Sequence, residues 1–232
     1  MTAHNLIDTP PRLEYISQEI VGIKLEPIVA LRSMHQVGVE VLSVLSESRY
    51  SEDFFGDRSA EWSISLLEAQ LAALKNTPRG DNLFINLPIT VLTESAPFQR
   101  LIRLSGAPLH IEIVDPATFL ALSAAQKQRV IENLMQLRNR GHAVWLDDVD
   151  EILVQSFLSS RLPLSGIKID KEAFWRLRDT PALRQLVSRC FQLAGHVLIE
   201  GIETERDRTW ALEAGADLGQ GYYWPSWTWP ED

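Results

Sequence analysis

Gly166-Ile167-Lys168-Ile169 and His196-Val197-Leu198-Ile199 are two short, mainly apolar runs that stand on either side of a helical stretch ending at Gly195. Each run has the length of a strand that is buried on both faces. Each is also followed by a carboxylate, Asp170 or Glu200. Strands of this kind, separated by helices, predict an α/β fold with a parallel sheet covered on both sides.

The same alternation continues in both directions along the chain. We expect further strands at residues 21–29, 37–45, 82–87, 109–113, 143–146 and 218–222, and helices at 60–75, 123–140, 152–160 and 205–214. About eight strands in one domain of 232 residues imply a closed barrel rather than an open sheet. The first two strands flank the short turn 32–35 and read as a hairpin. The predicted fold is therefore a modified (β/α)8 TIM-like barrel with an antiparallel early strand.

The end of the chain departs from a regular barrel. No room remains after Tyr222 for an eighth helix, so we expect the final covering helix to be missing. Trp224, Trp227 and Trp229 alternate with other residues there, and we interpret them as a plug over the open flank, with a partner-binding surface as the alternative. We expect an N-terminal extension at residues 1–18 and a single barrel domain at residues 19–232.

Composition excludes several classes of partner. The formal net charge of −9 argues against binding a DNA or RNA polymer. No run of eighteen apolar residues occurs, so we expect no membrane span. Cys190 is the single cysteine, which rules out an internal disulfide and fits a cytoplasmic location. It lies on an amphipathic helix face, where we expect it to serve packing.

Polar residues recur at the carboxyl ends of the predicted strands, where parallel barrels form their active sites. In chain order they are Glu40, Asn86, Glu112, Asp147 and Asp148, Lys168 and Asp170, Glu200 and Glu203, and Gln220. Carboxylates at one mouth repel one another unless cations neutralise them. Mg²⁺ or Mn²⁺ suits these oxygen ligands, and two ions sharing carboxylates can clamp a phosphoryl oxygen and generate hydroxide from water. Lys168 would hold the attacking water or offset charge on the phosphate.

Other interpretations of these residues remain. We expect Asp170 to cap a helix, because Lys171 begins a helical stretch. The five histidines lack zinc-site spacing, and we expect His110 and His142 to be structural. A Schiff-base aldolase using Lys168 would need an apolar pocket that lowers the lysine pKa, and the acidic ring does the opposite.

Eight short motifs resemble, in order and in spacing, those of EAL domains, which are bacterial cyclic-di-GMP phosphodiesterases. The motifs are Leu25-Glu26-Pro27-Ile28-Val29, Gly38-Val39-Glu40-Val41-Leu42, Ile85-Asn86-Leu87, Leu109-His110-Ile111-Glu112-Ile113, Leu146-Asp147-Asp148, Lys168-Ile169-Asp170, Glu200-Gly201-Ile202-Glu203-Thr204 and Gln220-Gly221-Tyr222. The resemblance implies hydrolysis of cyclic-di-GMP to linear pGpG with Mg²⁺ or Mn²⁺ in second-messenger signalling.

The resemblance also implies roles for the matched residues. The implied metal ligands are Glu40, Asn86, Glu112 and Asp147 for a first ion and Asp148 for a second. Lys168 and Glu200 correspond to the residues that handle the attacking water. Glu203 corresponds to the acid that holds the loop beside the metals, and Gln220 to the active-site glutamine.

Three departures weaken the expected substrate contacts. Glu26, which we group with Glu203 and Gln220 as support for substrate and loop, stands where the family usually has Gln. Val44 stands where the family has an arginine that grips a substrate phosphate, and Asp150-Glu151-Ile152 replaces a glycine-containing loop. Each added acid would cost roughly 1 kcal/mol near a dianionic substrate. The lost arginine contact would cost about 1.5–3 kcal/mol.

These departures leave three functions open. The first is a cyclic-di-GMP phosphodiesterase with weakened activity. The alternative is a catalytically inactive EAL-like regulatory module that acts through contact with a protein partner or in a homodimer. A receptor that binds cyclic-di-GMP without cutting it is the third, and the weakened substrate contacts argue against it.

Overall fold

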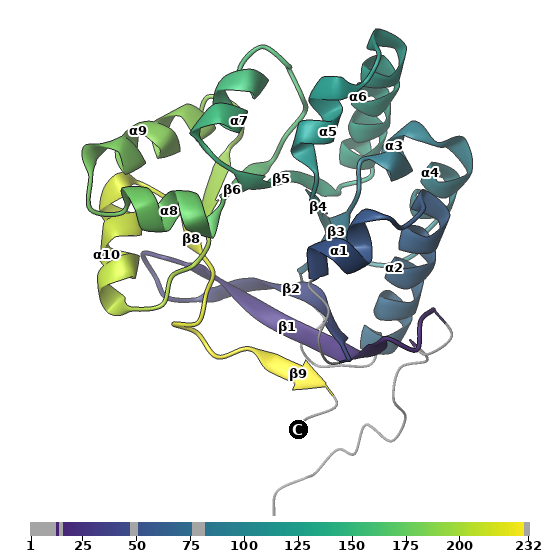
Figure 1. Ribbon diagram of the computed structural model, residues 1–232, viewed down its shortest axis with the longest axis horizontal. Coiled ribbons are helices and arrows are strands. Elements are labelled where there is room, and N and C mark those ends of the chain that lie inside the picture. The colour runs from purple at the N-terminus through teal and green to yellow at the C-terminus, as the bar shows by residue number, and fades with distance from the viewer. Residues whose placement is uncertain (1–12, 14–15, 47–50, 76–81, 230–232) are drawn as a thin grey trace, which may run out of the picture.

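In the computed structural model, residues 13, 16–46, 51–75 and 82–229 are described, and they form one closed barrel with a ninth strand on its flank (Figure 1). The strands are β1 Ile20–Ala30, β2 Gln36–Leu45, β3 Leu83–Leu87, β4 His110–Ile113, β5 Ala143–Val149, β6 Gly166–Ile169, β7 His196–Ile199, β8 Leu218–Gly219 and β9 Trp227–Trp229. Strands β2 to β8 are parallel, and β1 closes the barrel antiparallel to both β2 and β8. The predicted barrel with an antiparallel early strand is thus confirmed. The 1–18 extension lies mostly outside the described residues.

Helices cover most of the barrel. They are α1 Ser51–Gly56, α2 Ala60–Leu74, α3 Thr90–Thr93, α4 Ser95–Leu101, α5 Pro116–Ala121, α6 Ala124–Asn139, α7 Glu151–Phe157, α8 Lys171–Leu177, α9 Pro181–Cys190 and α10 Glu205–Ala214. The helices expected at 60–75, 123–140, 152–160 and 205–214 are present as α2, α6, α7 and α10. The short helices α1, α3, α4 and α5 were not predicted, because helices this short show too little periodicity. Among the described residues, no helix is both long and apolar enough to cross a membrane.

The helical stretch before Gly195 is two helices rather than one. Thr180 caps α9 by accepting a hydrogen bond from the backbone of Ala182, and Pro181 is the first helical residue. Proline is favoured at a helix start, where its missing N–H is not needed, and it disfavours helical backbone in the residue before it. The break after α8 therefore follows from Thr180-Pro181.

The last barrel strand is shorter than the expected 218–222. It ends at Gly219 because the chain turns at Gly221, where φ is +147°. A Cβ at Gly221 would lie 2.3 Å from the carbonyl oxygen of Ile202, so only glycine fits this close approach. The turn carries the chain away from the barrel axis toward β9.

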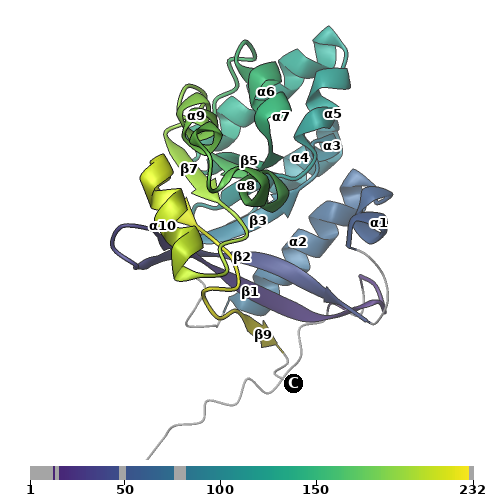
Figure 2. The same ribbon diagram turned by 60° about the vertical axis from the view of Figure 1, so that its left-hand side comes forward.

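No helix follows β8 among the described residues, in agreement with the expected missing covering helix. The chain continues instead into the short strand β9. It pairs antiparallel with β1, from Trp227 opposite Leu25 to Trp229 opposite Ile23. The side chains of Trp224 and Trp227 pack against the main core, which supports the plug interpretation of the tail. In both views the β1–β2 hairpin and β9 lie on the side of the molecule away from α5 and α6 (Figure 1, Figure 2).

Alternate residues of each strand point into the barrel. Ile28, Phe84, Trp145 and Leu198 form a separate buried cluster inside it. The residues next to them in sequence pack outward under the helices; they include Ile85, Val144 and Val197. We call the inner cluster the floor. Gly166 is needed beside it, because a Cβ there would lie 2.1 Å from the indole of Trp145.

Two of the histidines serve the fold, as expected. His110 stacks on Phe84 with ring centroids 4.0 Å apart, and its Nδ1 accepts a hydrogen bond from the indole N–H of Trp145 at 3.1 Å. The Nδ1 atom of His142 accepts a hydrogen bond from the backbone N–H of Leu109 at 3.0 Å. Burial first, and then the nearby charge of His196, lower the pKa of His110 to about 4.

Candidate active site at the carboxyl ends of the strands

The predicted site residues lie one step above the floor. Asn86, Asp147 and Glu200 each follow a floor residue by two positions, which in a strand places them on the same inward face. Because β1 runs the other way, its inward residue at this height is Glu26, two positions before Ile28. Glu40, Glu112 and Lys168 pair in register with floor residues, and their longer side chains reach this layer, where Gln220 also contacts Glu40. We call this layer the acidic ring.

Lys168 lies at the centre of the acidic ring. Its Nζ is 2.7 Å from Glu200 Oε1, 3.0 Å from Asp147 Oδ1, 3.2 Å from Glu112 Oε1 and 3.3 Å from Glu40 Oε2. The lysine side chain is only 1% exposed. Four carboxylates thus face one ammonium, which leaves three negative charges in excess when all four are ionised.

A chain of hydrogen bonds extends from Glu40 toward β1. Asn86 Nδ2 donates to Glu40 Oε1 at 2.9 Å, and Gln220 Nε2 donates to Glu40 Oε2 at 2.6 Å. The same Gln220 amide lies 3.1 Å from Glu26 Oε2, and Glu26 Oε1 lies 2.5 Å from Lys24 Nζ. The charge of Glu26 is therefore offset by Lys24, a partner that sequence reasoning missed.

Several buried oxygens of the ring have no polar partner among the described residues other than the Lys168 ammonium. They are both carboxylate oxygens of Glu112, Asp147 Oδ1, Asn86 Oδ1 and Gln220 Oε1. Oxygen atoms of Glu40, Glu112 and Asp147 lie within 4.8 Å of one another, and so do those of Asp147, Asp148 and Glu200. Unpaired carboxylate and amide oxygens are the ligands that Mg²⁺ and Mn²⁺ prefer. The two overlapping groups fit one or two such ions.

Burial is the largest single influence on the pKa of each charged group at the centre of the ring. It raises the pKa of Glu112 and Glu200 well above the ordinary value, and that of Asp147 to a smaller extent, although the charge of Lys168 opposes each shift. Burial would also raise the pKa of Glu40, but Lys168 and the two amide hydrogen bonds outweigh it and lower that pKa. Burial would lower the pKa of Lys168, and the carboxylates outweigh it and raise that pKa well above its usual range. The ammonium therefore stays charged.

Asp148 stands at the mouth of the barrel in a left-handed backbone conformation, with φ of +50°. This conformation is uncommon for a residue other than glycine, and aspartate is among the residues that tolerate it best. Burial first, and then the charge of Asp147, raise the pKa of Asp148 to about 6. Asp148 thereby adds a third carboxylate beside Asp147 and Glu200.

The acids after Asp148 are used by the fold. Asp150 caps α7, and its Oδ1 accepts hydrogen bonds from the backbone N–H groups of Ile152 and Leu153 at 2.9 and 2.8 Å. Glu151 pairs with Arg176 of α8, with two contacts of 2.6 and 3.0 Å. The repulsion expected from these two acids is therefore reduced.

Two expectations about single acids have different outcomes. Asp170 caps α8 as predicted, with Oδ2 accepting from the backbone of Ala173 at 3.0 Å. The side chain of Glu203 is exposed, and the structure assigns it no hydrogen bond or ion pair among the described residues. The loop after β7 is instead held by Asp207, whose Oδ2 accepts from the backbone N–H groups of Glu203 and Thr204. The Thr204-x-x-Asp207 spacing of a capping box could have revealed this.

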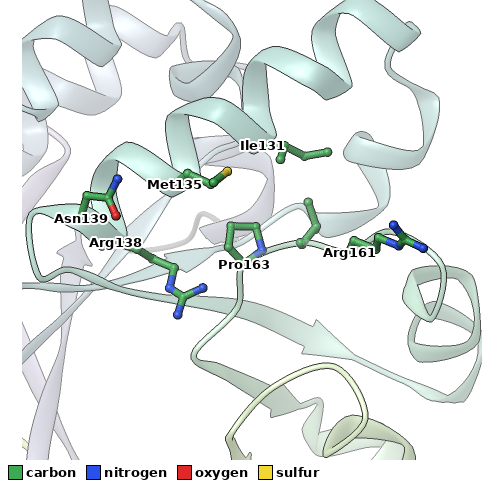
Figure 3. A pocket seen from close by; sticks show the side chains of 7 residues that line it. Ile131, Met135, Arg138, Asn139, Arg161 and Pro163 are labelled. Carbon is green, nitrogen blue, oxygen red and sulfur yellow. The ribbon is translucent and has the colours of Figure 1, made fainter.

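A separate hollow of about 570 Å³ lies outside the barrel, between α6 and the segment that leads into β6 (Figure 3). Arg138 and Arg161 lie on opposite sides of Pro163, and Ile131 and Met135 from α6 lie above it in this view. No carboxylate lines this hollow, so it is unsuited to a metal ion. We call it the α6 groove.

Fold and site together define a closed α/β barrel whose strand ends gather oxygen ligands for divalent cations. The chain belongs to the EAL domain family, because the model of the EAL domain matches residues 14–226. Among curated proteins, the cyclic di-GMP phosphodiesterase RocR of Pseudomonas aeruginosa is 27% identical over 96 residues. That match covers 40% of this chain and 24% of RocR, so the chain spans only part of that relative.

Solved structures confirm the fold. An EAL domain protein from Listeria monocytogenes EGD-e has a TM-score of 0.66 at 22% identity, with 95% of this chain and 94% of that chain covered. BlrP1 of Klebsiella pneumoniae, in a complex with manganese and cyclic-di-GMP, has a TM-score of 0.70 at 20% identity, with 89% of this chain and 55% of that chain covered. At these identities the likeness concerns the barrel itself.

Proposed function

We propose that this chain is a metal-dependent phosphodiesterase that hydrolyses cyclic-di-GMP to linear pGpG. The observation that carries the proposal is the acidic ring, in which four carboxylates converge within 3.3 Å of one buried ammonium. Its place at the carboxyl ends of the strands is where barrel enzymes hold their chemistry. Membership of the EAL family and the similarity to RocR support cyclic-di-GMP as the proposed substrate.

The ring residues divide into metal ligands and residues that act on water. The metal ligands we propose are Glu40, Asn86, Glu112 and Asp147 for a first Mg²⁺ or Mn²⁺ and Asp148 for a second. Bound divalent ions lower the pKa of water and stabilise charge on a phosphoryl oxygen. Gln220 fixes Glu40 by its 2.6 Å hydrogen bond, and Glu26 steadies Gln220 from the other side. Glu203 would take part in the adjoining loop through its backbone N–H, which donates to Asp207 Oδ2.

Lys168 and Glu200 are placed to handle the attacking water. The charged lysine donates hydrogen bonds to the water, and Glu200, 2.7 Å from the ammonium, accepts its proton. The water oxygen bonds to phosphorus, the bond from phosphorus to the ribose 3′ oxygen breaks, and that oxygen takes up a proton from solvent. The products carry one new 5′-phosphate and one new 3′-hydroxyl, as in linear pGpG.

The departures from the family pattern weaken substrate binding less than the sequence suggests. Asp150 and Glu151 are engaged in a helix cap and an ion pair, and Glu26 is paired with Lys24. Val44 still provides no charge for a phosphate. We therefore propose modest activity in a cytoplasmic signalling role.

Hydrolysis of cyclic-di-GMP with Mn²⁺, followed by separation of products, tests the proposal directly. Turnover to pGpG that disappears in Glu40→Ala is the expected result. Glu132→Ala is the matched control, because Glu132 is an exposed acid of α6 that accepts a hydrogen bond from Gln128 and does not belong to the acidic ring. Absence of turnover, together with absence of cyclic-di-GMP binding in a calorimetric titration with Ca²⁺, would contradict the proposed enzymatic activity.

The α6 groove favours a second candidate, a regulatory module that acts through protein contact. Met135 is 53% exposed in the groove. Neither Arg138 nor Arg161 has an ion pair or hydrogen bond with another described side chain, in a chain of net charge −9. Arg161 is also held in a left-handed conformation, with φ of +53°. An apolar strip between two free cations fits a partner segment that is apolar and acidic.

Binding of a labelled peptide of alternating Glu and Leu, measured by fluorescence anisotropy at low and high salt, tests the second candidate. We expect salt-sensitive binding that is lost in the double variant Arg138→Glu with Arg161→Glu. The matched control reverses two other exposed arginines, Arg184 and Arg189 of α9. Equal loss in both double variants would show that binding follows net charge and not the groove.

A further inference from the structure

Lys24 belongs to the same inward face of β1 as Glu26 and Ile28. Ile28 is part of the floor, and Glu26 reaches the acidic ring through Gln220. Because side chains of a strand alternate, Lys24 is the next inward residue, one step above the ring and toward solvent. Its partner on β2 is Leu42. Lys24 thus stands at the rim of the barrel mouth.

Tyr222 stands at the same rim, beside Lys24. The Lys24 ammonium is 5.6 Å from the centroid of the Tyr222 ring. The turn at Gly221, pressed against the backbone of Ile202, fixes the chain between Gln220 in the ring and Tyr222 outside it. The tyrosine side chain is 78% exposed, the largest exposed fraction among the large apolar and aromatic residues that the structure describes. The Lys24 ammonium lies over one face of the ring, and most of the side chain is open to solvent.

The charge at the rim matters for any phosphate that approaches the acidic ring. The inward residues of β2 at and above this height, Leu42 and Val44, carry no charge. Lys24 has three N–H donors, and its ion pair with Glu26 engages one oxygen of that carboxylate. The lysine side chain is 27% exposed, so donors remain for a phosphate oxygen.

We propose that Lys24 and Tyr222 form a subsite that binds one phosphate and one purine base of the substrate. This rests on the proposed function and deepens it by naming residues that hold the cyclic dinucleotide above the acidic ring. The base stacks on the tyrosine ring, and the ammonium contacts the adjoining phosphate. Lys24 thus supplies a cation at the rim from β1. The neighbouring strand β2 supplies none, because its inward residues there are Leu42 and Val44.

Calorimetric titration of cyclic-di-GMP with Ca²⁺, which holds the ligand without measuring turnover, tests the subsite. We expect Kd to rise about 5- to 100-fold in Tyr222→Ser, the range for loss of one base stack. Tyr222→Phe keeps the ring and should bind within twofold of the wild type. We expect Lys24→Met to raise Kd about tenfold and to flatten the salt dependence of binding, and Lys24→Arg to restore both.

Controls separate the subsite from the rest of the site. The unfolding midpoint in Mn²⁺ should rise equally in the wild type, Tyr222→Ser and Lys24→Met, because the acidic ring is unchanged. Lys127→Met removes a half-buried lysine of α6 near Phe119 and should leave Kd unchanged. If the wild type binds cyclic-di-GMP and the Kd values of Tyr222→Ser and Lys24→Met lie within twofold of it, the subsite alone is overturned. No binding by the wild type would overturn the proposed function and the subsite together.

Discussion

The Nζ atom of Lys168 lies 2.7 Å from Oε1 of Glu200, and this is the shortest of the four contacts that join the lysine to the acidic ring. The two residues come from neighbouring parallel strands, β6 and β7, whose register places Lys168 opposite Leu198. The lysine therefore reaches diagonally across the barrel interior toward the strand ends. In this position it serves as a built-in counterion for the carboxylates.

Replacement of Lys168 by methionine should destabilise the protein strongly. Removing one partner of a buried ion pair leaves uncompensated charge, and the typical loss in the free energy of unfolding is about 3–5 kcal/mol. Arg176→Met is the control, because the Arg176–Glu151 pair is exposed and such pairs contribute about 0–1 kcal/mol. Urea titrations in EDTA measure both values. Similar small losses in the two variants would contradict the role of Lys168 as counterion.

Glu40→Gln and Glu112→Gln should differ in their effect on stability. Glu40 accepts hydrogen bonds from two amides, and a glutamine would place N–H groups against those donors, at a loss of about 1–3 kcal/mol. Glu112 has no polar partner among the described residues other than the Lys168 ammonium at 3.2 Å, which a glutamine oxygen can still face, so its replacement should cost less. Urea titrations in EDTA compare the variants. Both should lose the added stability that MnCl₂ gives the wild type, and retention of it in both would argue against the metal site.

Gly166→Ala should damage the floor of the barrel. The added Cβ would lie 2.1 Å from the Trp145 indole, which is 1% exposed and has no room to move. Overpacking of this kind typically costs about 1–3 kcal/mol. Gly56→Ala is the control, because no atom lies within 4 Å of a Cβ there. Thermal unfolding followed by circular dichroism should show a lower midpoint for Gly166→Ala alone.

Cys190 should resist alkylation in the folded protein. It is fully buried on α9, and burial raises the pKa of its thiol from 9.0 to about 12. The unfolded chain loses this proton near pH 9 while the folded chain keeps it, so the thiol's contribution to stability is complete below pH 9 and is lost as the pH rises toward 12. Iodoacetamide labelling with and without urea checks the resistance to alkylation. Unfolding curves of the wild type and Cys190→Ala between pH 8 and 11 check the pH dependence of stability, since only the wild type carries this contribution.

The sequence by itself determined the barrel and the composition of its mouth. Apolar runs such as 166–169 and 196–199 have strand length, and the residue after or within each run is polar at the carboxyl end. Parallel strands bring those ends to one edge, so local pattern is enough to predict that Glu40, Glu112, Asp147 and Glu200 meet. Asp170 is likewise a local feature, and it caps α8 as expected.

Only the tertiary structure decided how the ring is neutralised and where the tail lies. Lys168 and Glu40 are 128 positions apart, and Gln220 and Glu26 are 194 apart. Such contacts arise when the barrel closes, and no rule about neighbouring residues predicts their distances. The pairing of β9 with β1 and the salt bridge of Glu151 with Arg176 have the same origin. Sequence fixes which groups each strand end carries, whereas barrel closure sets which of them come within hydrogen-bond distance.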